Sequence, residues 1–448
     1  MALRLGFYLR LLRAEGLSGL QARFGVRRAH VRNLRSFRPT GAAELRGLGL
    51  PLLNLLPVSR SPLLGGVQVQ LATRLAEEAR LRPVGLLFPE AGSYRLEAQW
   101  QGQRWFHDCG PATAGAEALA RALGRALELT GARAVHAENL ASFGAHGLLD
   151  AEPALGALAR LRAADPGALV VSLHDYAVFC PRPFQVERPG ERFCAFSRDL
   201  ERCRRCLSNV PVPARLESTR ASAGALLAGA SALVCPSPEM RARLLELIPG
   251  LVPERLRAIA PSSGTRPSAD FPRWPPRHAA IVGATRLEKG AHVAAELVPL
   301  LRALGLSVSA HGGAGDVRAL LAVRQAGALQ RGSYAPGALP ERLRAERADL
   351  AVLPSIGPET YSLALDECWA AGLPTVLFDV GAAAARVREL GGGLLAPLDS
   401  AAQGLAAAVA ALLREPRPPV VPRDQLPTAA GAARAHLALY EELGIAGS

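Results

Sequence analysis

Short apolar segments typical of strands alternate with segments of helical periodicity, and this alternation constrains the fold more than any other feature of the chain. The first series of strand-like segments lies at residues 52–56, 84–88, 134–137 and 169–173. The second series lies at residues 279–282, 306–310, 350–353 and 375–378. Apolar positions at helical spacing separate the members of each series. The pattern predicts an α/β fold with parallel sheets that are covered by helices on both faces.

A proline-rich segment separates the two series. Residues 261–276 hold five prolines and show little periodicity, so we predict an interdomain linker there. The prediction is an N-terminal Rossmann-like domain at 49–260, a C-terminal Rossmann-like domain at 277–420, and a segment at 421–448 that packs back on the N-terminal domain. Because open parallel sheets bind ligands at the carboxyl ends of their strands, both sheets are expected to face a central cleft.

Basic charge is concentrated near the N-terminus. The formal net charge is +13, and residues 1–48 contribute +8 of it, from ten arginines and two glutamates. Apolar residues such as Leu11, Leu17 and Phe24 are interleaved with these arginines. The pattern is typical of a helix on an anionic membrane surface, although a basic extension packed on the fold would have the same composition. Nucleic acid is not expected, because no aromatic-basic platform accompanies the arginines.

No membrane span and no secretory signal are expected. The sequence has no run of about 18 or more strongly apolar residues. Arg4, Arg10 and Arg13 interrupt the first apolar stretch, which is unlike a signal peptide. We therefore predict a cytoplasmic protein that is either free or peripheral on the inner membrane face.

Two glutamates, Glu359 and Glu367, stand eight residues apart where a strand-like segment leads into a helix. The start of a helix offers unpaired N–H groups and a positive dipole end, which favour a phosphate. Carboxylates beside that phosphate can accept hydrogen bonds from the hydroxyl groups of a sugar or ribose. A solvated loop glutamate and a helix-surface glutamate would give the same spacing.

Two further segments favour phosphate binding. Lys289, the only lysine of the chain, lies between the first strand and the first helix of the second series. A compact ammonium in an otherwise arginine-rich chain indicates a diphosphate, although ordinary surface placement is the alternative. Gly65 and Gly66 precede a helix-like segment of the first series and would let backbone N–H groups approach a phosphate, but glycines also serve tight turns.

One histidine lies where a strand ends. His174 follows the strand-like segment at 169–173 and is expected to point into the cleft. It could orient an acceptor hydroxyl or contact a sugar there. A hydrogen bond to the backbone at the strand end is the alternative.

Four of the seven cysteines lie within 27 residues, in a loop (180–206) rich in proline, arginine and glycine: Cys180, Cys194, Cys203 and Cys206. Cys203-x2-Cys206 has the spacing of zinc ligands, and four thiolates would close a structural site with no catalytic position. A second Cys-x-x-Cys pair is missing, so reduced thiols and redox disulfides remain alternatives. The other three are expected to be small buried hydrophobic residues: Cys109, Cys235 and Cys368.

The segment PETYSLALDECWAAGLPT, residues 358–375, resembles the Glu-x7-Glu signature of glycosyltransferase family 4. Four other segments are similar to that family: Gly65-Gly66, His174-Asp175 followed by Cys180-Pro181, Cys235-Pro-Ser237, and Phe378–Gly381. The His-Asp-Tyr segment and its cysteine loop resemble a subgroup common in bacterial polysaccharide clusters. The resemblance covers about residues 52–398 and leaves out residues 1–48.

The resemblance implies a GT-B fold, in which two Rossmann-like domains face each other. It implies transfer of a sugar from a nucleotide-sugar to a hydroxyl with retention of the anomeric configuration. It also implies roles for individual residues. Glu359 would contact the donor sugar, Glu367 the ribose and Lys289 the diphosphate, while backbone at Thr360, Tyr361 and Ser362 would line the donor.

Further roles follow from the same resemblance. Gly65 and Gly66 would offer amides opposite Lys289, and His174 would lie beside the donor sugar and the acceptor. Many family members have an arginine where Ala284 stands. Here an arginine occurs two residues later, so Arg286 is the expected diphosphate ligand.

The function predicted from the sequence is a retaining, metal-independent glycosyltransferase that moves a hexosyl or related group in polysaccharide or glycolipid synthesis. The acceptor would be a saccharide or a lipid-linked saccharide. No Asp-x-Asp motif of the metal-dependent sugar transferases occurs in the chain. One alternative is a nucleotide-sugar epimerase or phosphorylase on the same architecture. Another is a non-catalytic subunit that binds a sugar nucleotide.

Overall fold

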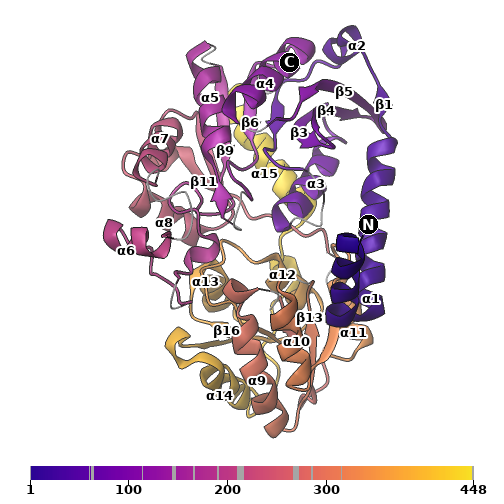
Figure 1. Cartoon of the computed structure of the whole chain (residues 1–448), viewed down its shortest axis with the longest axis vertical. Coiled ribbons are helices and arrows are strands. Elements are labelled where there is room, and N and C mark those ends of the chain that lie inside the picture. Colours follow the sequence, from indigo (N-terminus) through magenta and orange to yellow (C-terminus); the bar gives the residue numbers. More distant parts are fainter. Residues whose placement is uncertain are drawn as a thin grey trace. The chain divides into compact units, whose positions relative to one another are not determined.

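The computed structural model describes residues 2–59, 61, 65–113, 115–143, 148–164, 167–188, 191–208, 216–265, 272–283, 286–313 and 315–445. The chain divides into two compact units (Figure 1). Unit 1 comprises Met1–Ala29, Gly190–Phe193 and Ser263–Pro427. Unit 2 comprises His30–Pro189, Cys194–Ser262 and Thr428–Ser448. The chain therefore changes unit at Ser262, at the start of the proline-rich segment, and returns at Thr428.

A nine-stranded sheet forms the centre of unit 2, in the order β1-β5-β4-β3-β2-β6-β9-β10-β11. The strands are β1 (Arg38–Pro39), β2 (Leu53–Leu55), β3 (Val84–Glu90), β4 (Ser93–Trp100), β5 (Gln103–Pro111), β6 (Ala134–Ala137), β9 (Ala168–Ser172), β10 (Ala232–Cys235) and β11 (Leu256–Ala258). In this sheet order, every pairing in the stretch β3-β2-β6-β9-β10-β11 is parallel. The strands predicted in the first series are therefore neighbours in one sheet. A small separate sheet pairs β7 (Ser142–Phe143) with β8 (Leu149–Asp150).

The antiparallel hairpin β4–β5 was not among the predicted elements. Strand β4 pairs antiparallel with both β3 and β5 at one end of the large sheet. Its sequence SYRLEAQW alternates apolar and polar residues, which is the period of a half-buried strand. The sequence therefore contained a strand pattern at 93–100. It was overlooked because the surrounding alternation of strands and helices led us to expect parallel strands only.

Helices of unit 2 follow the periodicity of their apolar residues. The helices are α2 (Ala42–Gly47), α3 (Gly66–Glu78), α4 (Ala116–Thr130), α5 (Glu152–Ala164), α6 (Leu200–Cys206), α7 (Leu216–Ala228), α8 (Pro238–Leu247) and α15 (Ala429–Glu442). In α4, Leu119, Leu123 and Ala126 lie on one buried face. The helix ends at Gly131, whose φ of 71° is the left-handed conformation that closes many helices.

The C-terminal helix α15, yellow in Figure 1, packs against α3 within unit 2. Its Leu439 and Tyr440 are buried in one apolar cluster with Leu52, Val170 and Val234 from the sheet. Burial of two large side chains in a shared core makes this helix an integral part of unit 2.

The basic N-terminal region contains the long helix α1 (Ala2–Arg35), followed by β1 and α2. Strand β1 joins the large sheet beside β5, and Leu45 of α2 is fully buried. Residues 38–47 thus belong to the fold of unit 2. None of the helices in the described ranges is both long and apolar enough to cross a bilayer.

Unit 1 contains a six-stranded sheet with every pairing parallel, in the order β14-β13-β12-β15-β16-β17. Its strands are β12 (His278–Val282), β13 (Ser307–His311), β14 (Leu329–Gly332), β15 (Leu350–Leu353), β16 (Thr375–Phe378) and β17 (Gly393–Ala396). Its helices are α9 (Ala291–Ala303), α10 (Val317–Gln325), α11 (Leu339–Ala345), α12 (Leu363–Ala370), α13 (Gly381–Leu390) and α14 (Ala401–Leu412). Four of the strands match the second predicted series, and the predicted α/β class is confirmed.

Candidate functional site

In unit 1, the loops that follow β12 and β15 lie side by side because these two strands are parallel neighbours. The backbone N–H of Ile356 donates to the carbonyl oxygen of Glu288 at 3.2 Å. The same carbonyl accepts from the Ser355 hydroxyl at 3.3 Å. This contact brings Lys289, on the first loop, into an ion pair with Glu359, on the second. Two residues that the sequence singled out separately are therefore in direct contact.

Two glycines allow the loops to approach this closely. Gly290 has a φ of 73°, and a Cβ there would lie 1.8 Å from the carbonyl oxygen of Pro354. Gly381, at the start of α13, has a φ of 68°, and a Cβ there would lie 2.8 Å from the backbone nitrogen of Glu359. The N–H of Ala382 donates to the carbonyl oxygen of Glu359 at 2.9 Å. Both glycines serve to place the Glu359 loop.

The Glu359 loop ends at the N-terminus of α12. Ser362 precedes the helix with φ 78° and its side chain makes no capping hydrogen bond to the first turn. Glu367 lies in the second turn, where its Oε1 accepts a hydrogen bond from the N–H of Gly337 at 3.2 Å. Burial raises the pKa of the Glu367 carboxyl to about 7, and the Gly337 hydrogen bond opposes that rise. The second glutamate is therefore a buried carboxyl that is held by a backbone N–H.

Tyr361 is oriented by residues that sequence reasoning missed. Its ring is buried, and the guanidinium carbon of Arg386, on α13, lies 4.1 Å from the ring centroid. Arg386 also forms a buried ion pair with Asp366 of α12. The Tyr361 side chain thus packs inward, and its carbonyl oxygen accepts a 3.4 Å hydrogen bond from Arg386. The placement of Arg386 had no local sequence signal, because it depends on how α12 and α13 pack.

Three more donor-site predictions can be placed. Thr360 is partly exposed between Glu359 and the buried ring of Tyr361. Arg286 is exposed at the start of the short turn Leu287–Lys289, and its carbonyl oxygen accepts from the Lys289 N–H at 3.1 Å. Ala284, where the resemblance led us to look for an arginine, lies outside the described residues.

In unit 2, Gly66 is the first residue of α3, and Gly65 precedes it with a φ of 149°. Gly65, at the N-cap position, has no side chain that could cap the first turn. Leu64, before the two glycines, lies outside the described residues. The glycine loop therefore lies at a helix start, as predicted, and its phosphate-binding role stays a prediction.

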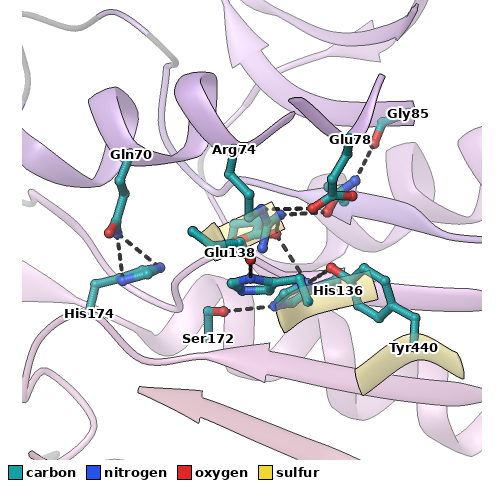
Figure 2. Close-up of polar contacts among 12 residues, drawn as sticks. Gln70, Arg74, Glu78, Gly85, His136, Glu138, Ser172, His174 and Tyr440 are labelled. Atoms are coloured by element: carbon teal, nitrogen blue, oxygen red, sulfur yellow. Dashed lines mark hydrogen bonds and ion pairs between the residues drawn. The ribbon is translucent and has the colours of Figure 1, made fainter. Parts of the chain in front are cut away.

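His174 lies just beyond the carboxyl end of β9, as predicted. Its Nδ1 is 2.7 Å from the side-chain nitrogen of Gln70, which projects from α3 (Figure 2). Burial, together with the positive charge of Arg74, lowers the pKa of His174 to about 3, so the imidazole is neutral near pH 7. His174 and Gln70 line a pocket of about 430 Å³ whose other polar walls are Arg74, Glu138, Ser262 and His436.

A buried polar network that the sequence did not predict continues from this pocket to α15 (Figure 2). Arg74 forms ion pairs with Glu138 and with Glu78, the latter at 3.0 Å. His136, at the centre of β6, lies 2.6 Å from the Tyr440 hydroxyl. Burial raises the pKa of Glu138 to about 7, against the opposing effect of Arg74. The available signals were His136 within the otherwise apolar strand Ala134–Ala137 and Arg74 within the helix Gly66–Glu78.

The four cysteines of the 180–206 loop line a single cavity of about 360 Å³. Cys203 and Cys206 lie on α6, whose first turn is capped by Asp199. Among the residues that the structure describes, no group of three or more histidine, cysteine, aspartate or glutamate side chains is arranged to hold a metal ion. The predicted zinc site is therefore not preassembled. The other three cysteines, Cys109, Cys235 and Cys368, are buried as expected.

Comparison with solved structures identifies the fold. Sucrose-phosphate synthase from Thermosynechococcus elongatus superimposes with a TM-score of 0.62 at 17% identity, covering 88% of this chain and 100% of that one. The Anabaena protein HepE in complex with UDP and glucose gives 0.52 at 16% identity, covering 88% and 96%. The catalytic domain of starch synthase IV from Arabidopsis thaliana, bound to ADP and acarbose, gives 0.54 at 11% identity, covering 88% and 98%.

The fold is GT-B. Residues 276–415 also match the family model described as "Glycosyl transferases group 1". That segment holds the Lys289–Glu359 pair and all of α12. No curated protein matches the chain in a sequence search. The fold and the matched segment together support a glycosyltransferase.

Proposed function

We propose that the protein is a retaining glycosyltransferase of the family 4 type, and that unit 1 binds its nucleotide-sugar donor. The ion pair between Lys289 and Glu359, next to the uncapped start of α12, carries this proposal. An ammonium and a helix N-terminus at one place favour a diphosphate. A carboxylate in contact with that ammonium is placed to accept hydrogen bonds from sugar hydroxyls.

The chemistry follows from the charge that develops during transfer. Breaking the bond between the sugar and the phosphate leaves negative charge on the diphosphate. Lys289 and the N–H groups at the start of α12 stabilise that charge, and they do so without a divalent ion. Glu359 holds the sugar, and Glu367 takes the ribose hydroxyls. Arg286 is proposed as a further phosphate ligand, and the glycine loop at Gly65 and Gly66 is proposed as an anion site of unit 2.

The donor class is a nucleoside diphosphate sugar. The Anabaena protein of the same fold carries UDP and glucose, and the starch synthase domain carries ADP and acarbose. We therefore expect a uridine or adenosine nucleotide, and an acceptor hydroxyl on a saccharide or a lipid-linked saccharide. Such a reaction would serve polysaccharide or glycolipid synthesis.

Ligand-induced thermal stabilisation tests the donor site. Nucleotide-sugars that bind the native state raise its unfolding midpoint, so a panel of UDP- and ADP-sugars should contain at least one stabilising member. Lys289→Ala and Glu359→Gln should abolish both that shift and sugar transfer while the unliganded midpoint stays nearly unchanged. Glu389→Gln, an exposed carboxylate of α13, is the matched control. Undiminished transfer in both site variants would reject the proposal.

A second experiment separates the competing enzyme classes. The stabilising nucleotide-sugar is incubated with the protein, first without an acceptor and then with a mixture of saccharides. Transfer gives a glycoside only in the second case. An epimerised sugar in the first case would favour an epimerase. A third incubation, of the saccharide mixture with inorganic phosphate and no nucleotide-sugar, would yield a sugar phosphate if the protein were a phosphorylase.

We also propose that α1 contacts an anionic membrane surface. Leu17, Phe24 and Val31 are exposed and spaced by seven residues, which places them on one face of the helix. Exposed Arg27 and Arg28 lie beside them. Sedimentation with phosphatidylglycerol-containing vesicles should fall sharply in Leu17→Ser/Val31→Ser, and should not change in Leu81→Ser, another exposed leucine. Equal binding by all three proteins would refute the proposal.

The cysteine cavity is proposed as a structural zinc site that closes when the metal binds. The Cys206 sulfur accepts from the N–H of Arg188 at 3.4 Å, and the Cys203 sulfur accepts from Arg220 at 4.0 Å. Such N–H donors stabilise thiolates. Cys180, Cys194, Cys203 and Cys206 would hold the ion as thiolates, and zinc would supply a structural cross-link for the 180–206 loop. Metal analysis should find zinc in the purified protein and in Cys109→Ser, but not in Cys203→Ser. Zinc-free protein with four titratable thiols would refute the site.

A further inference from the structure

The loops that follow β6 and β9 lie side by side in unit 2, because these two strands are parallel neighbours. Each loop supplies one polar wall of the pocket described above, Glu138 after β6 and His174 after β9 (Figure 2). The next residues along the chain, Asn139 and Asp175, are hydrogen-bonded to each other, since Asn139 Nδ2 donates to Asp175 Oδ2 at 3.1 Å. One side-chain contact therefore joins the two loops at positions adjacent in sequence to the two pocket residues.

The orientation of the Asn139 amide is fixed by its other partners. Its Oδ1 accepts from the N–H of Leu140 at 3.0 Å, and its Nδ2 also donates to the carbonyl oxygen of Ala141 at 3.4 Å. A backbone N–H only donates and a carbonyl oxygen only accepts, so turning the amide over would lose both of these bonds. The N–H group that Asn139 directs at Asp175 is therefore specified by groups other than Asp175.

Asp175 shapes the loop that carries His174. Its Oδ1 accepts from the N–H of Ala177 at 2.8 Å, which forms a turn directly after the histidine. Its Oδ2 accepts from Asn139. Burial raises the pKa of Asp175, and these two N–H donors oppose the rise. The carboxylate thus ties the residue next to His174 both to its own loop and to the loop after β6.

The backbone of Asn139 is strained. Its φ is 121°, well beyond the φ of about 50–70° that asparagine tolerates in the left-handed region. Such conformations are unfavourable and occur mainly where the surrounding structure and a functional site impose them. Glycine would adopt this φ without strain. The contacts of the buried Asn139 side chain are therefore the physical advantage of asparagine at this position.

We propose that Asn139 is a positioning residue for sugar transfer, which acts through Asp175 to fix the loop after β9 and so holds His174 in place for contact with the acceptor. The role of His174 in transfer rests on the proposed function. The hydrogen bond between Asn139 and Asp175 rests on contacts within unit 2 alone. The position of His174 and the kinetics of transfer therefore test the two parts separately.

Exchange of the two side chains tests the contact. Asn139→Asp places two carboxylates against each other and should break the hydrogen bond, whereas Asn139→Asp/Asp175→Asn restores one donor and one acceptor with the roles reversed. The readout is the His174 ring signals in ¹H–¹⁵N spectra of the full chain with ¹⁵N-labelled histidine, identified by their loss in His174→Gln. These signals should shift in Asn139→Asp and return toward their wild-type positions in the double variant. Gln103→Glu adds the same charge at an exposed site of β5 and should leave them unshifted.

Kinetics of transfer with a stabilising nucleotide-sugar test the role. Loss of a hydrogen bond to a carboxylate corresponds to about 10- to 100-fold in rate, so kcat should fall by that factor in Asn139→Asp, with KM for the donor nearly unchanged. The double variant should recover most of the lost kcat. Asn139→Gly removes the side chain but relieves the backbone, so its unfolding midpoint should stay near that of wild type while kcat falls to the same extent. A merely structural side chain would lower kcat only together with the midpoint.

Three results would overturn the inference: wild-type kcat in Asn139→Gly, His174 signals that do not shift in Asn139→Asp, or a double variant that recovers neither the signals nor kcat. The first and third are judged only if wild type transfers sugar, whereas the second needs no activity. If the signals shift and return as expected but wild type turns over no nucleotide-sugar, the proposed function fails and the positioning of His174 by Asn139 stands.

Discussion

Replacing Gly290 by alanine should separate the two loops of unit 1 that hold Lys289 and Glu359. The added methyl carbon would lie 1.8 Å from the carbonyl oxygen of Pro354, closer than any two such atoms can stay. The atom that must give way belongs to the backbone of the loop after β15. Displacement of this oxygen shifts the loop segment that leads from Pro354 to Glu359. The ion pair between Glu359 and Lys289 is then stretched or broken.

The cost has two parts. An alanine at the φ of 73° found for Gly290 costs about 1–2 kcal/mol relative to glycine. Forcing an extra carbon into a packed contact typically costs about 1–3 kcal/mol more. Alanine also restricts the unfolded chain, which returns about 0.4–1 kcal/mol. We therefore expect Gly290→Ala to lower the free energy of unfolding by about 1–5 kcal/mol.

Gly305 provides the matched control in the same unit. Its φ of 81° is close to that of Gly290, but a Cβ there would meet nothing within 4 Å. Gly305→Ala should lose at most about 1.5 kcal/mol, because only the conformational term applies. Urea titrations followed by circular dichroism give both free energies, and thermal shifts with a stabilising nucleotide-sugar report on the site. Equal destabilisation by the two variants, or a full nucleotide shift in Gly290→Ala, would refute the reasoning.

Two further predictions concern buried polar groups. Because the pKa of Glu367 is about 7 in the folded chain against an ordinary 4.5, the folded state binds more protons between these values, so stability should fall as pH rises from about 4.5 to 7. Glu367→Gln should flatten that part of the stability profile measured in buffered urea titrations, and an unchanged slope would contradict the buried carboxyl. Tyr440→Phe removes the 2.6 Å contact with His136 and should cost about 1–3 kcal/mol, measured as a lower unfolding midpoint. A midpoint within experimental error of wild type would show that the contact contributes nothing.

Much of unit 1 was predictable from local sequence. Strands β15 and β16 were predicted with the bounds that the structure has. These elements are bounded by clear signals, such as the apolar run before Pro354 and Gly372 after α12. Short elements with weaker patterns were missed, among them β14 and β17 at the two edges of the sheet.

The residues of the candidate site also fall into two groups, those that local sequence predicted and those that it did not. Lys289 and Glu359 were singled out by residue type and by their position after a strand, both of which are local properties. Arg74, Glu138 and Arg386 were missed because their importance depends on partners that lie 20 or more residues away. An arginine in an amphipathic helix looks the same in the sequence whether it faces water or a buried carboxylate.

By itself, the sequence determined the α/β class, the alternation of strands and helices, and the segments at which a phosphate and a sugar could be held. Each of these depends on periodicity or on residues within one turn or loop. The order of the strands was decided only in the tertiary structure, since β12 pairs with β15 and not only with the next strand along the chain. That order brings Lys289 to Glu359, much as the packing of α3 near the end of β9 brings Gln70 to His174. Contacts of this kind arise from long-range packing, and no short window of sequence contains both partners.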